Sequence, residues 1–115
     1  MIPSQMLKGT LEGCILEIVR RREIYGYEIS QELKRYGFGE ISDGTIYPLL
    51  MRLEKNGCIS ATYRSSAAGP RRKYYAITQE GDSQLRQFRA SWGELSAAVN
   101  LLFREEEPCN GQENR

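Results

Sequence analysis

The apolar periodicity of this 115-residue chain changes twice along its length, and this order of periods limits the folds that it can adopt. Residues 7–57 place apolar side chains at helical spacing, residues 59–77 alternate apolar and polar side chains as strands do, and residues 85–102 return to helical spacing. The small, flexible segment 65–70 (SSAAGP) separates the two strands. The order therefore predicts a mainly α chain with a small β-hairpin between two helical regions.

Three helices are expected in the first region. The first runs from about Leu7 to Arg22, and the third begins close to Thr45. Pro48 then falls in the first turn of the third helix, where a missing N–H has no partner to lose. The buried face of the second helix is expected to consist of Tyr25, Ile29, Leu33 and Tyr36. Three helices followed by a hairpin is the element order of a winged helix-turn-helix.

The third helix and the hairpin carry an unusual set of exposed side chains. The helix turns aromatic, apolar and cationic residues away from its apolar stripe, and between positions 52 and 73 six Lys or Arg residues accompany a single acid. Such a helix can enter the major groove of DNA while a basic hairpin contacts the flanking phosphates. A merely solubilising charged face is the alternative. The candidate DNA-binding residues are Ser42, Thr45, Tyr47, Pro48, Arg52, Lys55, Arg64, Arg71, Arg72 and Lys73.

A heptad seam follows the cap-like Thr78. Its apolar positions are Leu85, Phe88, Trp92, Leu95, Val99 and Leu102, spaced alternately by three and four residues. The seam predicts either a dimerisation helix or a helix that packs on the core of its own domain. We favour the homodimer, because the element order of the winged domain is already complete before the seam begins. The expected organisation is a DNA-binding domain over 1–78, a dimerisation helix over 79–103 and a disordered tail over 104–115.

The composition excludes several functions. The chain has no histidine, so His-based catalytic sites and His metal ligands are excluded. Its three cysteines, Cys14, Cys58 and Cys109, form neither a redox pair nor a zinc-ligand pattern, and glycine-rich phosphate loops are missing. Mean hydropathy is -0.55, and we see neither a membrane-spanning stretch nor a secretory signal. We therefore expect a cytoplasmic protein that is not an enzyme and holds no metal or cofactor.

Several motifs occur together and in one order. They are Leu7–Glu12 (LKGTLE), Tyr25–Ile29 (YGYEI), Asp43–Leu50 (DGTIYPLL) with Arg52–Glu54, and Gly69 with Arg71–Tyr75 (RRKYY). In this arrangement the chain resembles the PadR family of bacterial transcriptional regulators over residues 7–81. The single C-terminal helix with Trp92 is similar to that of the short-tailed subfamily, which includes a lactococcal multidrug-responsive repressor.

The resemblance implies a homodimeric repressor that binds operator DNA upstream of its own gene or of a transporter or detoxification gene. It places Thr45, Tyr47 and Pro48 at the DNA-facing helix start, Arg52 toward the groove or backbone, and residues 71–73 on the wing. It also implies that Trp92 lines a pore between subunits and stacks on planar hydrophobic ligands; a packed interface tryptophan is the alternative. From another functional class, a winged helix that serves as a protein-interaction module remains open.

Overall fold

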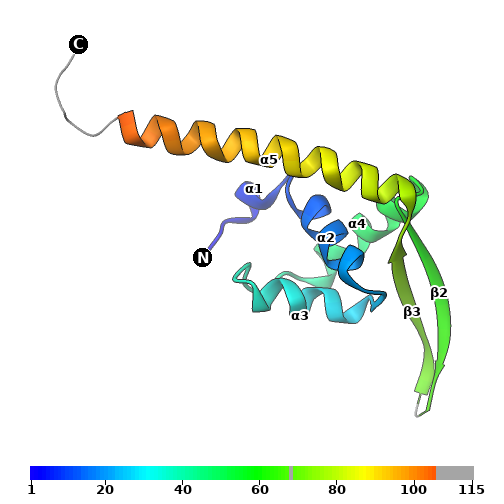
Figure 1. Cartoon of the computed structure of the whole chain (residues 1–115). Helices are drawn as coiled ribbons and strands as arrows, with labels where there is room; N and C mark the ends of the chain where they lie inside the picture. Colours follow the sequence, from blue (N-terminus) through cyan, green and yellow to red (C-terminus); the bar gives the residue numbers. More distant parts are fainter. Residues whose placement is uncertain (68, 106–115) are drawn as a thin grey trace. The chain divides into compact units, whose positions relative to one another are not determined.

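The computed structural model describes residues 1–67 and 69–105, and its contacts divide the chain into two units, Met1–Leu85 and Arg86–Arg115. The first unit contains α1 (Ser4–Leu7), α2 (Leu11–Arg21), β1 (Ile24–Tyr25), α3 (Tyr27–Arg35), α4 (Asp43–Lys55), β2 (Ile59–Ser66), β3 (Gly69–Ile77) and the start of α5 (Gln79–Glu105). The described part of the second unit is the rest of α5 (Figure 1). The expected mainly α winged-helix class is confirmed.

The strands form one antiparallel sheet in the order β1-β3-β2. The hairpin of β2 and β3, which we call the wing, projects away from α2, α3 and α4 (Figure 1). Its pairing runs from Ile59 opposite Ile77 to Ser66 opposite Gly69, so the strands extend further into the segment 65–70 than expected. The strand β1 was not predicted, because a strand of two residues is too short to show alternation.

The core of the first unit is built mainly from aliphatic side chains of α2, β1, α3, α4 and the start of α5. The side chains with almost no exposed surface are Ile15, Val19, Ile24, Ile29, Leu33, Ile46, Leu50 and Leu85. Among the described residues, no polar or charged side chain is fully buried. Burial of apolar surface is therefore the main force that brings α2, α3 and α4 together.

The first helix does not run from Leu7 as expected. The chain instead forms the single-turn α1, turns at Gly9, and begins α2 at Leu11. Gly9 has a φ of +90°, a left-handed conformation that a continuous helix does not allow. The Thr10 hydroxyl donates to the Leu7 carbonyl at 2.8 Å and so satisfies an acceptor at the end of α1.

The helix that was expected to begin close to Thr45 begins two residues earlier. Ser42 is the N-cap residue of α4, and its carbonyl accepts from the backbone N–H groups of Thr45 and Ile46 at 3.0 and 3.1 Å. Pro48 consequently lies beyond the first turn and cannot donate to the carbonyl of Gly44. Both residues are exposed, so water can hydrate that carbonyl.

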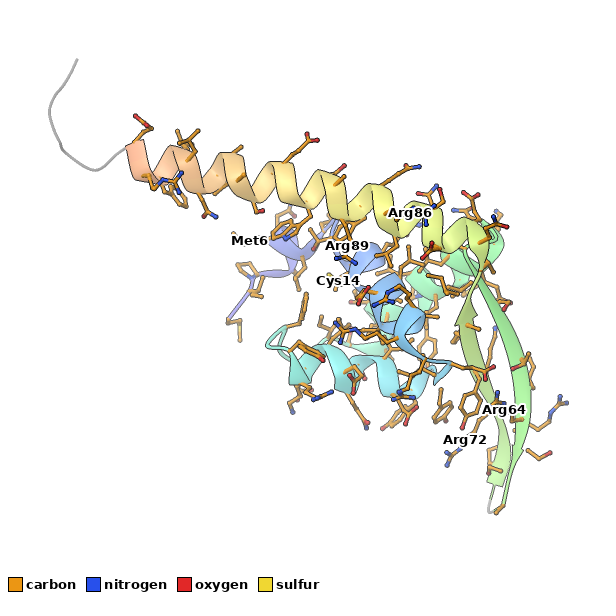
Figure 2. The ribbon with its side chains drawn as sticks, in the orientation of Figure 1. Met6, Cys14, Arg64, Arg72, Arg86 and Arg89 are labelled. Carbon is orange, nitrogen blue, oxygen red and sulfur yellow. The ribbon has the colours of Figure 1, made fainter. Side chains whose placement is uncertain are left out.

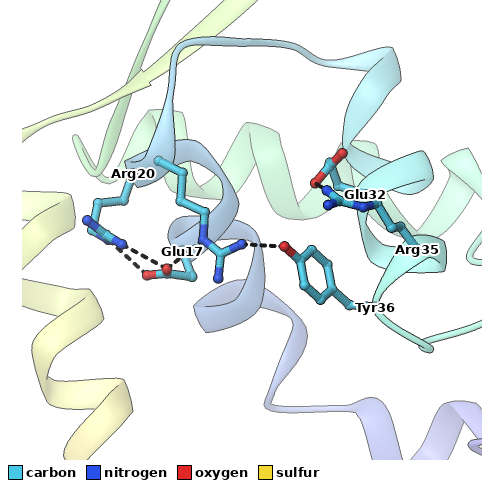
Figure 3. Close-up of polar contacts among 6 residues, drawn as sticks. Glu17, Arg20, Glu32, Arg35 and Tyr36 are labelled. Atoms are coloured by element: carbon cyan, nitrogen blue, oxygen red, sulfur yellow. Dashed lines mark hydrogen bonds and ion pairs between the residues drawn. The ribbon is translucent and has the colours of Figure 1, made fainter.

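Two tyrosines expected on the buried face of the second helix lie elsewhere. Tyr25 belongs to β1, and Tyr36 is 53% exposed. The hydroxyl of Tyr36 accepts a hydrogen bond from Arg21 Nη1 at 2.8 Å, which explains why this side chain stays at the surface (Figure 3). Hydrogen bonds from Arg20 and Arg21 to the Glu17 carboxylate lower the pKa of Glu17 to about 2, so this charged cluster is ionised at neutral pH.

The start of α5 is joined closely to the end of α4. Thr78 Oγ1 accepts from the backbone N–H of Gly81 at 3.0 Å, which is the cap expected at this residue, and its hydroxyl donates to the Gly57 carbonyl at 2.6 Å. The Thr78 N–H donates to the Cys58 carbonyl at 3.1 Å. Gly81 packs directly on that carbonyl group, since a Cβ built there would lie 1.9 Å from the Cys58 oxygen. Only glycine allows this approach.

We predict that Gly81→Ala destabilises the protein by about 2 kcal/mol or more, because the added methyl group forces the backbone at Cys58 to move. Urea denaturation followed by circular dichroism measures the change. Gly93→Ala in the same helix is the matched control, because a Cβ there meets nothing within 4 Å and alanine favours the helix. Equal stability of the two variants would contradict the close packing of Gly81.

Candidate nucleic-acid interface

The exposed face of α4 carries the side chains expected there. Ile46, Leu50 and Leu53 face the core, and these three side chains are almost fully buried. The opposite face exposes Tyr47 by 39% and Met51 by 66%. Pro48, Arg52 and Lys55 are also exposed. The helix therefore presents a mixed aromatic, apolar and cationic surface outward.

Two predicted hydroxyl residues lie at the N-terminal end of α4. Ser42 Oγ and Thr45 Oγ1 are 3.1 Å apart and both residues are exposed, and Ser42 makes no side-chain capping bond to the helix. The first N–H groups of a helix have no acceptor within it, and this end carries partial positive charge. Asp43 lies in the same turn, and its carboxylate interacts favourably with the partial positive charge of the helix end.

The wing combines its cations with aromatic rings. The guanidinium of Arg64 lies 4.5 Å from the ring centre of Tyr74, that of Arg71 lies 5.3 Å from Tyr63, and that of Arg72 lies 4.9 Å from Tyr25. Figure 2 shows Arg64 and Arg72 beside the wing strands, and the strand register places these two residues directly opposite each other. These contacts hold two opposed like charges on separate rings and so limit their repulsion.

The tyrosines of this surface were not predicted as site residues, except for Tyr47. Tyr25 and Tyr74 are half-buried, with ring centres 5.7 Å apart, and Tyr75 is a core residue at 3% exposure. Successive strand residues face opposite sides of a sheet, which is why these two adjacent tyrosines differ in burial. The strand register places Tyr63 opposite Lys73. The alternation of side chains along β2 and β3 could therefore have predicted that Tyr63 lies beside a wing cation. The contribution of Tyr25 depends on β1 and could not be read from the hairpin alone.

The predicted cations fall into two groups. Arg52 Nε lies 2.5 Å from the Glu12 carboxylate, Arg64 pairs with Glu23, and Lys73 Nζ lies 3.1 Å from Glu54 Oε1. Within the described part of the chain, no carboxylate pairs with the remaining three predicted cations. These three are Lys55, Arg71 and Arg72. On the wing and at the end of α4, these three cations thus carry positive charge that no carboxylate of the described ranges neutralises.

The predicted interface residues on α5 differ in exposure. Leu85 is only 2% exposed in the single chain, so almost no surface of it is left for a partner. Phe88 is half-buried. Beyond it, Trp92, Leu95, Val99 and Leu102 expose between 38% and 67% of their surface. Leu101 and Phe103 are exposed as well and were not predicted as interface residues.

The predicted disordered tail, which includes Cys109, lies outside the described residues apart from its first two positions. These two positions extend α5 to Glu105.

The described residues supply little for other chemistry. Burial raises the pKa of the Cys58 thiol and of the half-buried Cys14 thiol, so both are poor nucleophiles at neutral pH. In residues 1–67 and 69–105, no group of His, Cys, Asp and Glu side chains could hold a metal ion. Across the same ranges, no helix is both long enough and apolar enough to cross a membrane.

Together, the helical core, the basic wing and the outward face of α4 define a winged helix-turn-helix of the DNA-binding class. Residues 15–87 match the family model of the transcriptional regulator PadR-like family. The chain belongs to this family. Because its members are transcriptional regulators, the expectation that the chain is not an enzyme is confirmed.

Solved structures and curated relatives agree with this assignment. A PadR-like transcriptional regulator from Bacillus cereus is 52% identical with a TM-score of 0.78, covering 86% of this chain and 96% of that chain. A transcriptional regulator of Mycobacterium tuberculosis is 35% identical over 74% of this chain and 78% of its own length. Bacillus subtilis PadR in complex with operator DNA is 27% identical with a TM-score of 0.63, covering 70% of this chain and 46% of that chain.

We predict that Arg72→Ala weakens binding to all double-stranded DNA, because this guanidinium has no carboxylate partner among the described residues and is available to phosphates. The slope of log affinity against log salt should fall by about one. Fluorescence anisotropy over a salt series measures both quantities. Arg20→Ala on α2 removes the same charge from a residue that is paired with Glu17 and should leave the slope unchanged. An unaltered slope for the Arg72 variant would exclude a phosphate contact.

Proposed function

We propose that this chain is a homodimeric repressor that binds an operator through α4 and the wing. The observation that carries the proposal is the pairing of an outward-facing α4 with two wing arginines, Arg71 and Arg72, that no acid of the described chain neutralises. A protein-binding surface is usually depleted in charge at its centre, whereas a DNA-binding surface needs available cations. The operator complex of Bacillus subtilis PadR supports the same choice of partner.

The dimer is proposed from the apolar face of α5. Three successive positions of the heptad seam are Trp92, Leu95 and Val99. Their side chains are 49%, 55% and 38% exposed in the single chain. A contiguous apolar stripe of this kind is a liability on a monomer, and a second copy of the same helix would cover it. A two-fold dimer would place its two α4 helices on successive turns of a pseudo-palindromic site, roughly 34–36 Å apart.

The ligand response is proposed from Trp92. Its indole ring is half-exposed, and two copies related by a two-fold axis would offer a pair of large polarisable faces. A planar hydrophobic molecule between them would relieve repression if it favoured an arrangement of the two wings that does not fit the operator. The resemblance of the single C-terminal helix to that of the short-tailed subfamily implies such a response.

The first test is an anisotropy titration of the purified protein against the intergenic DNA upstream of its own gene. A scrambled duplex of equal length and composition is the control, and both are measured at two salt concentrations. The proposal predicts tighter, salt-sensitive binding to the intergenic DNA. Equal binding to both duplexes would contradict an operator in that region, and no binding at either salt would favour the protein-interaction module.

A second test concerns the dimer. Leu95→Glu should weaken dimerisation by more than about tenfold, since it would bury an unpaired carboxylate at the interface. Operator affinity should fall with it. Ala97→Glu adds the same charge at an exposed position on the opposite side of the helix and should remain dimeric. Light scattering measures both, and a dimeric Leu95 variant would contradict the role of the seam.

A further inference from the structure

Lys73 connects three elements of the winged-helix unit. It lies within β3, and its carbonyl accepts from the backbone N–H of Gly26, just before α3, at 3.1 Å. Its side chain reaches in another direction, where Nζ donates to Glu54 Oε1 on α4 at 3.1 Å. A single residue of the wing is thus bonded both to the start of α3 and to the end of α4.

The surroundings of Lys73 differ from those of the other wing cations. Its side chain is 31% exposed, against 61% for Arg52 and 50% for Arg64. Nζ lies 5.4 Å from the ring centre of the buried Tyr75 and 5.7 Å from that of Tyr63. The hydrogen bond to Glu54 raises the pKa of Lys73. Partial burial reduces the screening of this pair by salt, so it is stronger than a fully exposed ion pair.

The contact with Lys73 also stabilises the Glu54 carboxylate. It lies in the last turn of α4, where the partial negative charge of the helix end disfavours a carboxylate. Lys73 supplies the cation that offsets this cost from outside the helix. The two side chains therefore stabilise one particular placement of β3 against α4, which are the two elements that present the candidate DNA-binding surface.

We propose that the Glu54–Lys73 ion pair holds the wing at a fixed position relative to α4 and thereby sets selectivity for operator DNA. In this account Glu54 and Lys73 are positioning residues, and Lys73 is not the phosphate contact that the sequence predicted. The inference rests on the proposed function, since selectivity requires an operator.

The physical reason lies in the two components of DNA binding. Attraction to phosphates supplies non-specific binding and tolerates a loosely placed wing. Operator binding requires α4 in the groove and the wing on the flanking backbone at the same time, so any freedom between them must be lost on binding. Loss of the ion pair should therefore lower operator affinity more than affinity for unrelated DNA.

The experiment is a double-mutant cycle of Glu54→Ala, Lys73→Met and the double variant. The readouts are affinities for the upstream intergenic duplex and for its scrambled control, each over a salt series. We expect each single variant to lower the ratio of the two affinities about fivefold to tenfold, and the double variant to lower it no further. The salt slope of Lys73→Met should equal that of the wild type. Thermal denaturation confirms that each variant is folded.

Glu40→Ala is the matched control. It also removes a carboxylate from an ion pair, with Lys34, but this pair is highly exposed and joins α3 to the loop before α4. We expect it to leave the affinity ratio unchanged.

Two results would overturn the inference. An unchanged ratio in Glu54→Ala would show that the pair does not set selectivity, and a slope reduced by about one in Lys73→Met would show that Lys73 contacts phosphate. A wild-type protein that does not discriminate between the duplexes would instead contradict the proposed function.

Discussion

Burial of one apolar stripe on α4 determines most of what this molecule presents to its surroundings. Ile46, Leu50 and Leu53 are needed to close the core, and a helix that buries them must turn its other side outward. Tyr47 and Met51 are exposed for this reason and not through a separate feature of the fold. The aliphatic core thus orients the candidate DNA-binding surface before any polar contact contributes.

Polar contacts then divide the cations of that surface by role. Arg52, Arg64 and Lys73 each form an ion pair with a carboxylate from another part of the chain. Their charges are therefore partly neutralised within the fold. Arg71 and Arg72 rest on tyrosine rings, which support a guanidinium without neutralising it. A basic segment that looks uniform in sequence therefore contains both structural cations and cations that remain available to a polyanion.

Local patterns predicted the features that depend on neighbouring residues. Helical spacing indicated the exposed face of α4, and the cap at Thr78 followed from its place before the last helix. Features that depend on distant residues were missed. The strand β1 is too short to show a period, and Lys73 meets Glu54 from nineteen positions away, a distance that only the tertiary fold closes. The early start of α4 was not predicted, because Pro48 was expected to lie in the first turn of this helix, where its missing N–H costs no hydrogen bond.

We propose that two copies of this chain bind DNA together, each through α4 and the wing. Hydroxyl-radical footprinting of the wild-type protein on its upstream intergenic DNA tests it most directly. We expect two symmetric protected segments whose centres lie about one helical turn, or a multiple of it, apart. A single protected segment, or uniform protection along the duplex, would contradict a two-fold arrangement of winged helices on an operator.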